Sequence, residues 1–256
     1  GFVNDGFYTV DDFKPFDSKS RTWTLKDGVV NSSPLSGDPR PGNAKFKKLT
    51  PVDENSANPY TLTDDDRTVI GNTTPKFSGG FGLNATFKGF DVSAFFNFMY
   101  DFDVFNANKV MMTTWASNNY NNFSMDISAA KRWRNFDDMG NEIRYSPEIL
   151  AEFNKNATMW NPTSIGRPIA MSYAVEDGSF LRLNTATIGY TLPRAWTNKV
   201  GLSRVRFYAS GYNLFTITGY SGYDPEVDIA TGLTPNIDNN RYPRSRTYTF
   251  GVQLTF

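Results

Sequence analysis

Apolar and polar residues alternate strictly in five segments of the chain. In the last segment, residues 246–256, one side carries only large apolar residues: Tyr248, Phe250, Val252, Leu254 and Phe256. A repeat of two residues is typical of a β-strand with one apolar and one polar face. The same alternation predicts four further strands, at residues 77–88, 90–102, 179–192 and 203–215.

The predicted strands are long, and the connections between them alternate in length. Strands of globular proteins average about 5 to 6 residues, whereas a tilted strand that crosses a bilayer needs about 9 to 11. Lys88-Gly89 reads as a tight hairpin turn and 193–202 is a modest connection, whereas 103–178 and 216–244 are long. Outer-membrane barrels combine short periplasmic turns with long extracellular loops in this way. We therefore predict an all-β fold, a transmembrane antiparallel β-barrel of which this chain supplies five strands.

The amino-acid composition limits the kinds of function that this chain can have. The mean hydropathy is −0.47 and no run of about 18 apolar residues predicts a membrane helix, but barrel strands place only every second residue on lipid. Cysteine and histidine are absent, which excludes disulfides, thiolate catalysis and histidine general bases in this chain. With 26 basic and 26 acidic residues, no nucleic-acid partner is expected. Gly1 follows no initiator methionine or signal sequence, so we expect an N-terminal portion to be missing.

Six stretches carry a resemblance when they are taken together and in order. They are PGNAKFKKL (41–49), DDRTVIGNTTPKFSGGF (65–81), KGFDVSAFFNF (88–98), VEDGSFLRLNTATIGYTLP (175–193), YASGYNLFTITGYSGYDPEV (208–227) and YPRSRTYTFGVQLTF (242–256). They resemble the SusC/RagA group of TonB-dependent outer-membrane transporters. The resemblance covers most of the chain except the loop at residues 103–173, between the second and third predicted strands.

The resemblance implies a barrel of about 22 strands, with the last five in this chain. Residues 1–76 would be an extracellular loop region, 77–102 a strand hairpin, 103–178 a long extracellular loop, and 179–256 the last three strands with their loop. A plug domain and TonB box would lie upstream of Gly1. The implied partners are a SusD-like surface lipoprotein, the TonB complex, the lipid bilayer, and an oligosaccharide or peptide cargo; no cofactor is implied.

Candidate binding residues fall in the long loop. Trp115, Trp133 and Trp160 could stack on sugar rings, whose C–H faces suit flat aromatic side chains, and Tyr120 with the Asn-rich run 118–122 could bind sugar hydroxyls. The alternatives are that the tryptophans pack the loop onto itself or onto the lipoprotein, and that the run is a polar loop tip. We favour both alternatives. The same loop carries SPEILAEFN (146–154), which predicts a short helix with Ser146 as N-cap.

The faces of two predicted strands give two further sets of candidate functional residues. The polar side of 203–215 predicts four lumen-facing residues: Arg204, Arg206, Tyr208 and Tyr212. These could line a cargo path, although we favour pairing of the two arginines with acidic groups of a plug. The apolar side of the last strand predicts lipid contact and a barrel-assembly signal at Tyr248, Phe250 and Phe256.

Neither metal nor catalytic chemistry is predicted. The resemblance would allow a calcium loop after residue 49, with oxygen ligands from the aspartates at 53, 64, 65 and 66, but the glycine required for its sharp turn is missing. Asp101 with Asp103, or Asp137 with Asp138, could supply a glycosidase carboxylate pair, but nothing nearby marks a buried acid. Two rival classes remain open: a soluble or surface-attached carbohydrate-binding β-sandwich, with shorter strands, and a glycosidase.

Overall fold

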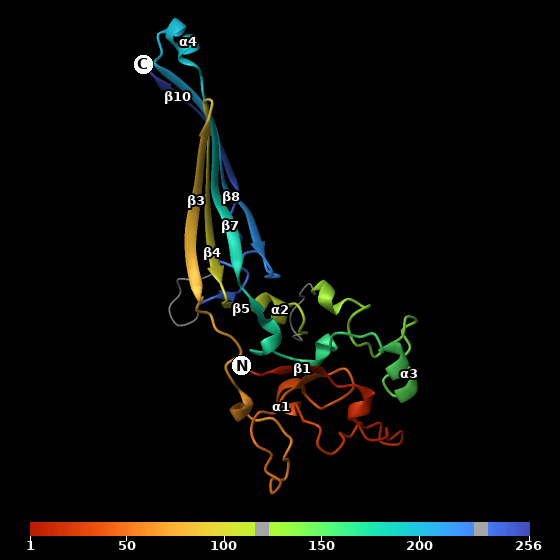
Figure 1. Cartoon of the computed structure of the whole chain (residues 1–256). Coiled ribbons are helices and arrows are strands. Elements are labelled where there is room, and N and C mark those ends of the chain that lie inside the picture. Colours follow the sequence, from red (N-terminus) through yellow and green to blue (C-terminus); the bar gives the residue numbers. More distant parts are fainter. Residues whose placement is uncertain (116–122, 228–234) are drawn as a thin grey trace. The chain divides into compact units, whose positions relative to one another are not determined.

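The structure, a computed structural model, describes residues 1–115, 123–227 and 235–256 (Figure 1). These residues form two compact units. Unit 1 comprises Gly1–Ile70 and Asn106–Val175, and unit 2 comprises Gly71–Phe105 and Glu176–Phe256. Tyr120 lies outside the described residues, so its predicted contact with sugar stays a prediction.

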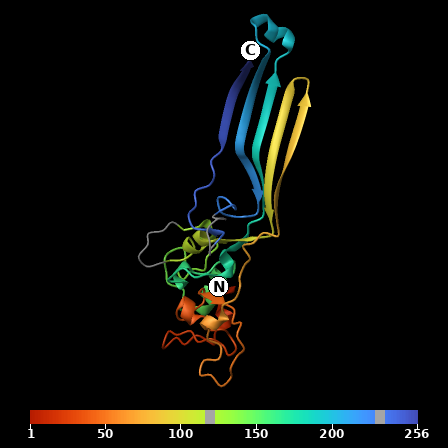
Figure 2. The ribbon, with the colours of Figure 1, turned by 90° about the vertical axis from the view of Figure 1, so that its left-hand side faces the viewer.

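Unit 2 is built on an antiparallel sheet of five long strands in the order β10-β8-β7-β4-β3, which lie side by side in Figure 2. Their bounds are β3 Phe77–Phe87, β4 Phe90–Tyr100, β7 Phe180–Thr191, β8 Arg204–Thr218 and β10 Thr247–Thr255. All five strands that the alternation predicts are present, and β8 runs three residues past its predicted end. The strands have 9 to 15 residues. A β-strand that spans a membrane needs about 9 to 11 residues, so all five are long enough.

The connections at one end of this sheet are short. Lys88 and Gly89 join β3 to β4 with φ angles of 46° and 87°, which is the backbone of a two-residue hairpin turn of the type that matches strand twist. After β7, Pro193 ends the pairing because it has no N–H to donate. A single turn of helix, α4 (Arg194–Thr197), and a 3₁₀ turn, η6 (Asn198–Val200), then lead into β8.

The register interrupts the alternation at one place in β7 and one in β8. Leu181 and Leu183 share a face with Ala186 because the pairing of β7 with both neighbours skips Asn184. In β8 the pairing skips residues 213 and 214, and Asn213 has a φ of 53°. Such bulges re-aim side chains and bend a strand. They keep the leucines with the other apolar residues of the sheet.

A smaller sheet and core lie at the end of the five-stranded sheet where β4 ends and β7 begins. Its three strands are ordered β6-β5-β9, with bounds β5 Asp103–Asn106, β6 Val175–Asp177 and β9 Ile237–Asp238. The accompanying cluster of buried residues is Phe102, Val104, Phe180, Tyr220 and Val227. This end of the sheet is therefore anchored by packing within unit 2.

Unit 1 contains the two segments that the sequence predicts as loops, and it has little regular structure. Strand β1 (Asn4–Phe7) pairs with β2 (Ala44–Phe46). The helices are short: α1 Ser33–Ser36, α2 Ala107–Met111 and α3 Pro147–Phe153, with 3₁₀ turns η1 Val10–Asp12, η2 Asp64–Asp66, η3 Met125–Ile127, η4 Pro162–Ser164 and η5 Ser172–Ala174. Helix α3 begins at Pro147 after Ser146, where the sequence predicts its start.

Aromatic side chains form much of the core of unit 1. Six are buried among the residues that the structure describes: Phe2, Tyr8, Phe13, Phe46, Trp133 and Trp160. Edge-to-face contacts join Tyr8 to Phe13 at 5.8 Å between ring centroids, and such pairs add about 0.5–1.5 kcal/mol to the free energy gained by burial. Unit 1 is thus a packed body with a core of its own.

The structure bears out part of the predicted fold. The long antiparallel strands form an open sheet, with β3 and β10 as its edges in the described part of the chain. The number of strands in a complete barrel stays a prediction. No helix among the described residues has the length and apolarity needed to cross a membrane.

Candidate functional site

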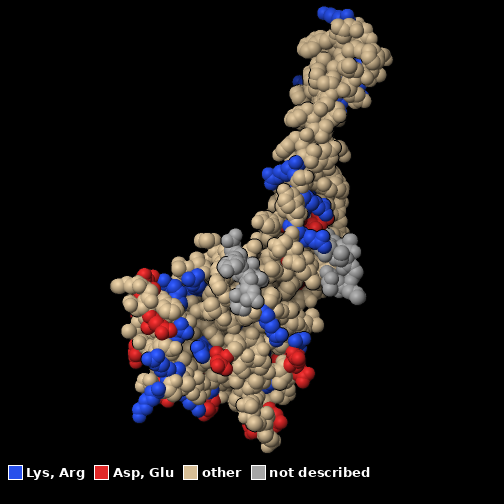
Figure 3. Space-filling model, turned by 180° about the vertical axis from the view of Figure 1, so that it is seen from behind, with Lys and Arg blue, Asp and Glu red and all other residues tan. Residues whose placement is uncertain are grey.

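One face of the five-stranded sheet is apolar and exposed. The register places one set of side chains on this face, and none of them is charged: residues 77, 81, 83, 85 and 87 of β3, 90, 92, 94, 96, 98 and 100 of β4, 181, 183, 186, 188 and 190 of β7, 205, 207, 209, 215 and 217 of β8, and 248, 250, 252 and 254 of β10. Leu83 is 60% exposed and Phe250 is 80% exposed. In Figure 3 charged side chains crowd unit 1 and are sparse along the strands. A continuous apolar surface of this extent marks contact with lipid or with another protein.

The opposite face is polar and carries an ion pair that crosses a strand. The Arg206 Nε on β8 donates to the Asp91 Oδ1 on β4 at 2.9 Å, and a second nitrogen pairs with the other carboxylate oxygen. Between them lies β7, where a Cβ atom at Gly189 would come within 2.5 Å of the guanidinium. The glycine therefore gives the arginine room to reach its partner. Nearby, the hydroxyls of Thr187 and Ser210 are 2.8 Å apart.

The four residues predicted to face the lumen share this polar face. Arg204, Arg206 and Tyr208 follow every second position of β8, and Tyr212 belongs to the same face opposite Thr185 and Thr247. The partner of Arg206 differs from the one that we favoured from the sequence, an acidic group of a plug. Arg206 pairs with Asp91 of the same sheet. Arg204 reaches only the hydroxyl of Thr191, at 3.4 Å.

A buried charge network at the end of the sheet was missed by the sequence reasoning. Arg182 of β7, 1% exposed, donates to Asn213 Oδ1 at 2.9 Å and pairs through both terminal nitrogens with Asp224. Glu226 lies 3.6 Å from Arg182 and 2.9 Å from Arg244. Burial raises the pKa of Asp224, but hydrogen bonds from Arg182 and from the Glu226 backbone N–H outweigh it and leave the pKa lowered. The four charges balance, and they tie the segment after β8 to β7.

The three tryptophans occupy different surroundings. Trp133 and Trp160 are 3% and 1% exposed, and their rings meet Phe7 and Tyr173 edge-on. Neither offers an open ring face to a sugar, so the packing alternative describes both. Trp115 is 46% exposed, and its stacking on a sugar ring stays a prediction.

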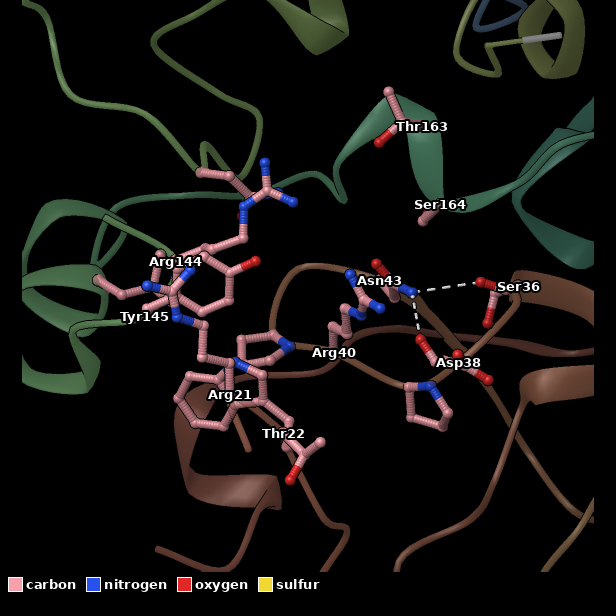
Figure 4. A pocket seen from close by; sticks show the side chains of 15 residues that line it. Arg21, Thr22, Ser36, Asp38, Arg40, Asn43, Arg144, Tyr145, Thr163 and Ser164 are labelled. Carbon is pink, nitrogen blue, oxygen red and sulfur yellow. Dashed lines mark hydrogen bonds between the residues drawn. The ribbon is translucent and has the colours of Figure 1, made fainter. Parts of the chain in front are cut away.

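A polar cavity of about 490 Å³ opens in unit 1. Its walls come from distant parts of the sequence and include three arginines: Arg21, Arg40 and Arg144 (Figure 4). Asp38 is the only acidic residue in its lining among the described parts of the chain. The sequence reasoning did not single out any of these residues. Their spacing gives no signal, because the cavity forms only when residues 21–43 meet residues 135–164.

The carboxylate pairs considered for glycoside hydrolysis hold local structure. Asp138 pairs with Arg134 at 2.7 Å, and Asp101 pairs with Lys76. Asp137 accepts hydrogen bonds from the side chain and backbone of Asn141, which lower its pKa. A general acid needs a raised pKa, whereas the pKa of Asp137 is lowered.

Asp66, considered as a calcium ligand, is fully buried and already occupied by donors. Its carboxylate accepts from the backbone N–H groups of Leu49, Thr50 and Thr63 at 2.8 to 2.9 Å and from the Thr50 hydroxyl at 2.7 Å. Lys48 Nζ lies 3.4 Å away. In the described ranges no three acidic side chains gather in the geometry of a metal site. Asp66 thus acts as an internal anion that joins two turns.

The stability of unit 1 is expected to fall in acid through Asp66. Burial raises the pKa of this carboxyl, but the hydrogen bonds outweigh it and hold the pKa well below its ordinary value of 3.8. The unfolded chain therefore takes up the proton first, so the stabilisation is complete above about pH 5 and is lost as the pH falls below 4. Asp66→Asn should cost about 2–3 kcal/mol at pH 7, and thermal unfolding should show that difference shrinking toward pH 3. Asp65→Asn, an exposed neighbour, is the control; a difference independent of pH would refute the assignment.

The chain is similar to known proteins in sequence and in structure. No family model matches the chain. The chain is 32% identical over 87% of its length to TonB-dependent receptor P3 of Formosa agariphila, and 32% identical over 59% of its length to TonB-dependent receptor SusC of Bacteroides thetaiotaomicron. It spans 20% and 15% of those two relatives, or about a fifth and a seventh of their length.

Solved structures agree on the fold. A chain of the RagAB peptide importer in its 'closed-closed' state matches the whole of this chain with a TM-score of 0.57, at 23% identity and over 22% of its own length. At that identity the match shows similarity of fold alone. The family rests on the sequence relatives, and they confirm the resemblance that the six stretches carry. The chain belongs to the TonB-dependent receptors, in the SusC/RagA group.

Proposed function

We propose that this chain forms part of the barrel wall and of the extracellular portion of an active importer in the bacterial outer membrane. The observation that carries the proposal is the uncharged, exposed face of the five-stranded sheet. In water such a face would drive aggregation, whereas lipid is the environment that it matches. The polar face, with Arg206 and Asp91, would then line the lumen.

The edges of the sheet support a larger barrel. Strands β3 and β10 have no partner on their outer sides among the described residues. Backbone N–H and C=O groups cannot stay unpaired in hydrocarbon, so further strands must close the sheet. We propose that the complete receptor has about 22 strands, as outer-membrane transporters with a plugged lumen do.

The connections give the direction of the sheet. The short turn at residues 88–89 and the connection at 192–203 lie at one end of the strands, and we place this end in the periplasm. Residues 1–76, 103–178 and 219–246 would then be extracellular. Phe256 follows β10 at the periplasmic end, and with Tyr248 and Phe250 it would form the barrel-assembly signal.

Partners and cargo follow from the family. A SusD-like surface lipoprotein would cover the extracellular mouth, and the TonB complex would supply energy through an N-terminal region. RagAB is a peptide importer by its own description, whereas we propose oligosaccharides as the cargo class here and peptides as the alternative. No catalytic step is required for this activity.

Gene deletion in the source bacterium tests the proposal. Cells without this receptor should lose growth on one class of oligosaccharide while growth on simple sugars is unchanged, because only large solutes need an active outer-membrane importer. Loss of TonB should abolish the same growth. Wild-type growth of the deletion strain on every oligosaccharide and peptide tested, or uptake that persists without TonB, would refute the proposal.

The rival class, a soluble carbohydrate-binding β-sandwich, fits the structure less well. A sandwich buries the inner faces of two sheets against each other. In the described part of the chain the other two sheets have two and three strands, and the apolar face of the large sheet is uncovered. The strands are also about twice the usual length of strands in globular domains.

A further inference from the structure

The lining of the cavity in unit 1 carries more basic than acidic side chains. Its lining contains Arg21, Arg40 and Arg144 but one carboxylate, that of Asp38. A volume of about 490 Å³ lies within the range of small-molecule sites, about 300–1,000 Å³. The cavity lies within unit 1 alone.

One wall holds two guanidinium groups against an aromatic ring. The Cζ atoms of Arg21 and Arg144 lie 5.2 and 5.7 Å from the ring centroid of Tyr145, and Figure 4 shows both side chains beside that ring. Glu142 pairs with the Nε atom of Arg144. The two terminal nitrogens of Arg144 are left for another partner. Stacking and pairing of this kind fix a guanidinium before a ligand arrives, which lowers the entropy lost on binding.

The facing wall carries the third arginine. Arg40 lies beside Asn43, whose amide donates to the carbonyl oxygens of Ser36 and Asp38 at 3.2 and 3.0 Å (Figure 4). Within the described ranges no carboxylate lies within 4 Å of the guanidinium of Arg40 or of Arg21. Two positive charges in the cavity are therefore uncompensated.

The remaining lining suits a sugar more than a peptide. Six of its fifteen residues carry an aliphatic hydroxyl or an amide side chain: Thr22, Ser36, Asn43, Asn135, Thr163 and Ser164. Such groups bind the hydroxyls of a carbohydrate, whereas a peptide would require more apolar surface for its side chains. Arginine forks match planar carboxylates and the oxygens of sulfate groups through paired hydrogen bonds.

We propose that this cavity binds a carboxylate or sulfate group of an acidic oligosaccharide, so that the cargo of the receptor is a uronate-containing or sulfated glycan. The inference rests on the proposed import function for its cargo, but the anion site itself does not. Arg21 and Arg40 contact the acidic group, and the stacked Arg144 completes the site.

Selenate, an anomalous scatterer with the shape of sulfate, tests the site directly. Crystals of the full-length receptor soaked in selenate should show an anomalous peak between Arg21, Arg40 and Arg144. Arg40→Ala should remove that peak, whereas Arg167→Ala, an exposed arginine of unit 1 outside the cavity, should keep it. A cavity without a peak in the wild-type receptor, or a peak that survives in both Arg40→Ala and Arg21→Ala, would overturn the assignment.

The cargo is tested separately with the glycan whose use is lost in the deletion strain. If it is acidic, Arg40→Ala should reduce its uptake about tenfold or more, the loss expected for one charge-assisted hydrogen-bonding group, and Arg167→Ala should not. A neutral glycan or a peptide as the cargo would overturn the inference while leaving the import function intact. If no cargo is imported but selenate binds, the import function fails and the anion site stands.

Discussion

Leu83→Arg is expected to reduce the amount of receptor assembled in the outer membrane about tenfold or more. Leu83 lies near the middle of β3, pairs with Ala94 of β4 and points out of the apolar face. An arginine on the lipid side of a barrel costs about 2–4 kcal/mol at the bilayer midplane. The measurement is the amount of folded receptor in isolated outer membranes, quantified by blotting without heating.

The neighbouring residue provides a matched control. Asn84 is next in β3 and faces the opposite, polar side. Asn84→Arg adds the same charge at the same depth, so it should leave assembly within about twofold of the wild type, since lumen positions of barrels accept polar groups. Equal losses for both variants, or no loss for either, would contradict the assignment of the two faces.

Arg182→Met is expected to destabilise the folded receptor by about 3–5 kcal/mol. The substitution leaves the Asp224 carboxylate beside a buried position without its cation, while Glu226 keeps Arg244. The removal of one partner of a buried ion pair carries a cost of this size. The measurement is the free energy of unfolding in urea, with the purified receptor in detergent micelles.

A double substitution separates the ion pair from packing. Arg182→Met combined with Asp224→Asn should recover part of the loss, because one stranded charge disappears with its partner. Arg204→Ala is the control, since this exposed arginine makes one long contact with a hydroxyl. If Arg182→Met costs less than about 1 kcal/mol, the network does not hold the segment after β8 in place.

The strands could be predicted from the sequence because the alternation that specifies them is local. Side chains two positions apart share a face, so the alternation places Phe250 and Val252 on one side of β10 whatever the rest of the chain does. The bulge in β7 could not be predicted in this way. It depends on pairing with β4 and β8, which moves Leu183 onto the same face as Ala186.

Unit 1 and its cavity could not be predicted because their contacts are distant in sequence. The burial of Trp133 depends on close approach to Gly42, where a Cβ atom would lie 2.1 Å from the indole. No periodic pattern in the sequence indicates a contact between two residues that are 91 positions apart, as Gly42 and Trp133 are. For the same reason the sequence offered only the loop tryptophans as candidate binding residues, with packing as the favoured alternative, whereas the charged cavity assembles from Arg21, Arg40 and Arg144.

The most direct test of the account is the surroundings of alternate positions in β10. The chain contains no cysteine, so single cysteines placed in this segment of the receptor can carry a nitroxide label without background from it. Labels at 250, 252 and 254 should be broadened by oxygen, which concentrates in lipid, and labels at 249 and 253 by a water-soluble nickel chelate. Equal exposure to the nickel chelate at odd and even positions would contradict the claim that this sheet is part of a membrane barrel.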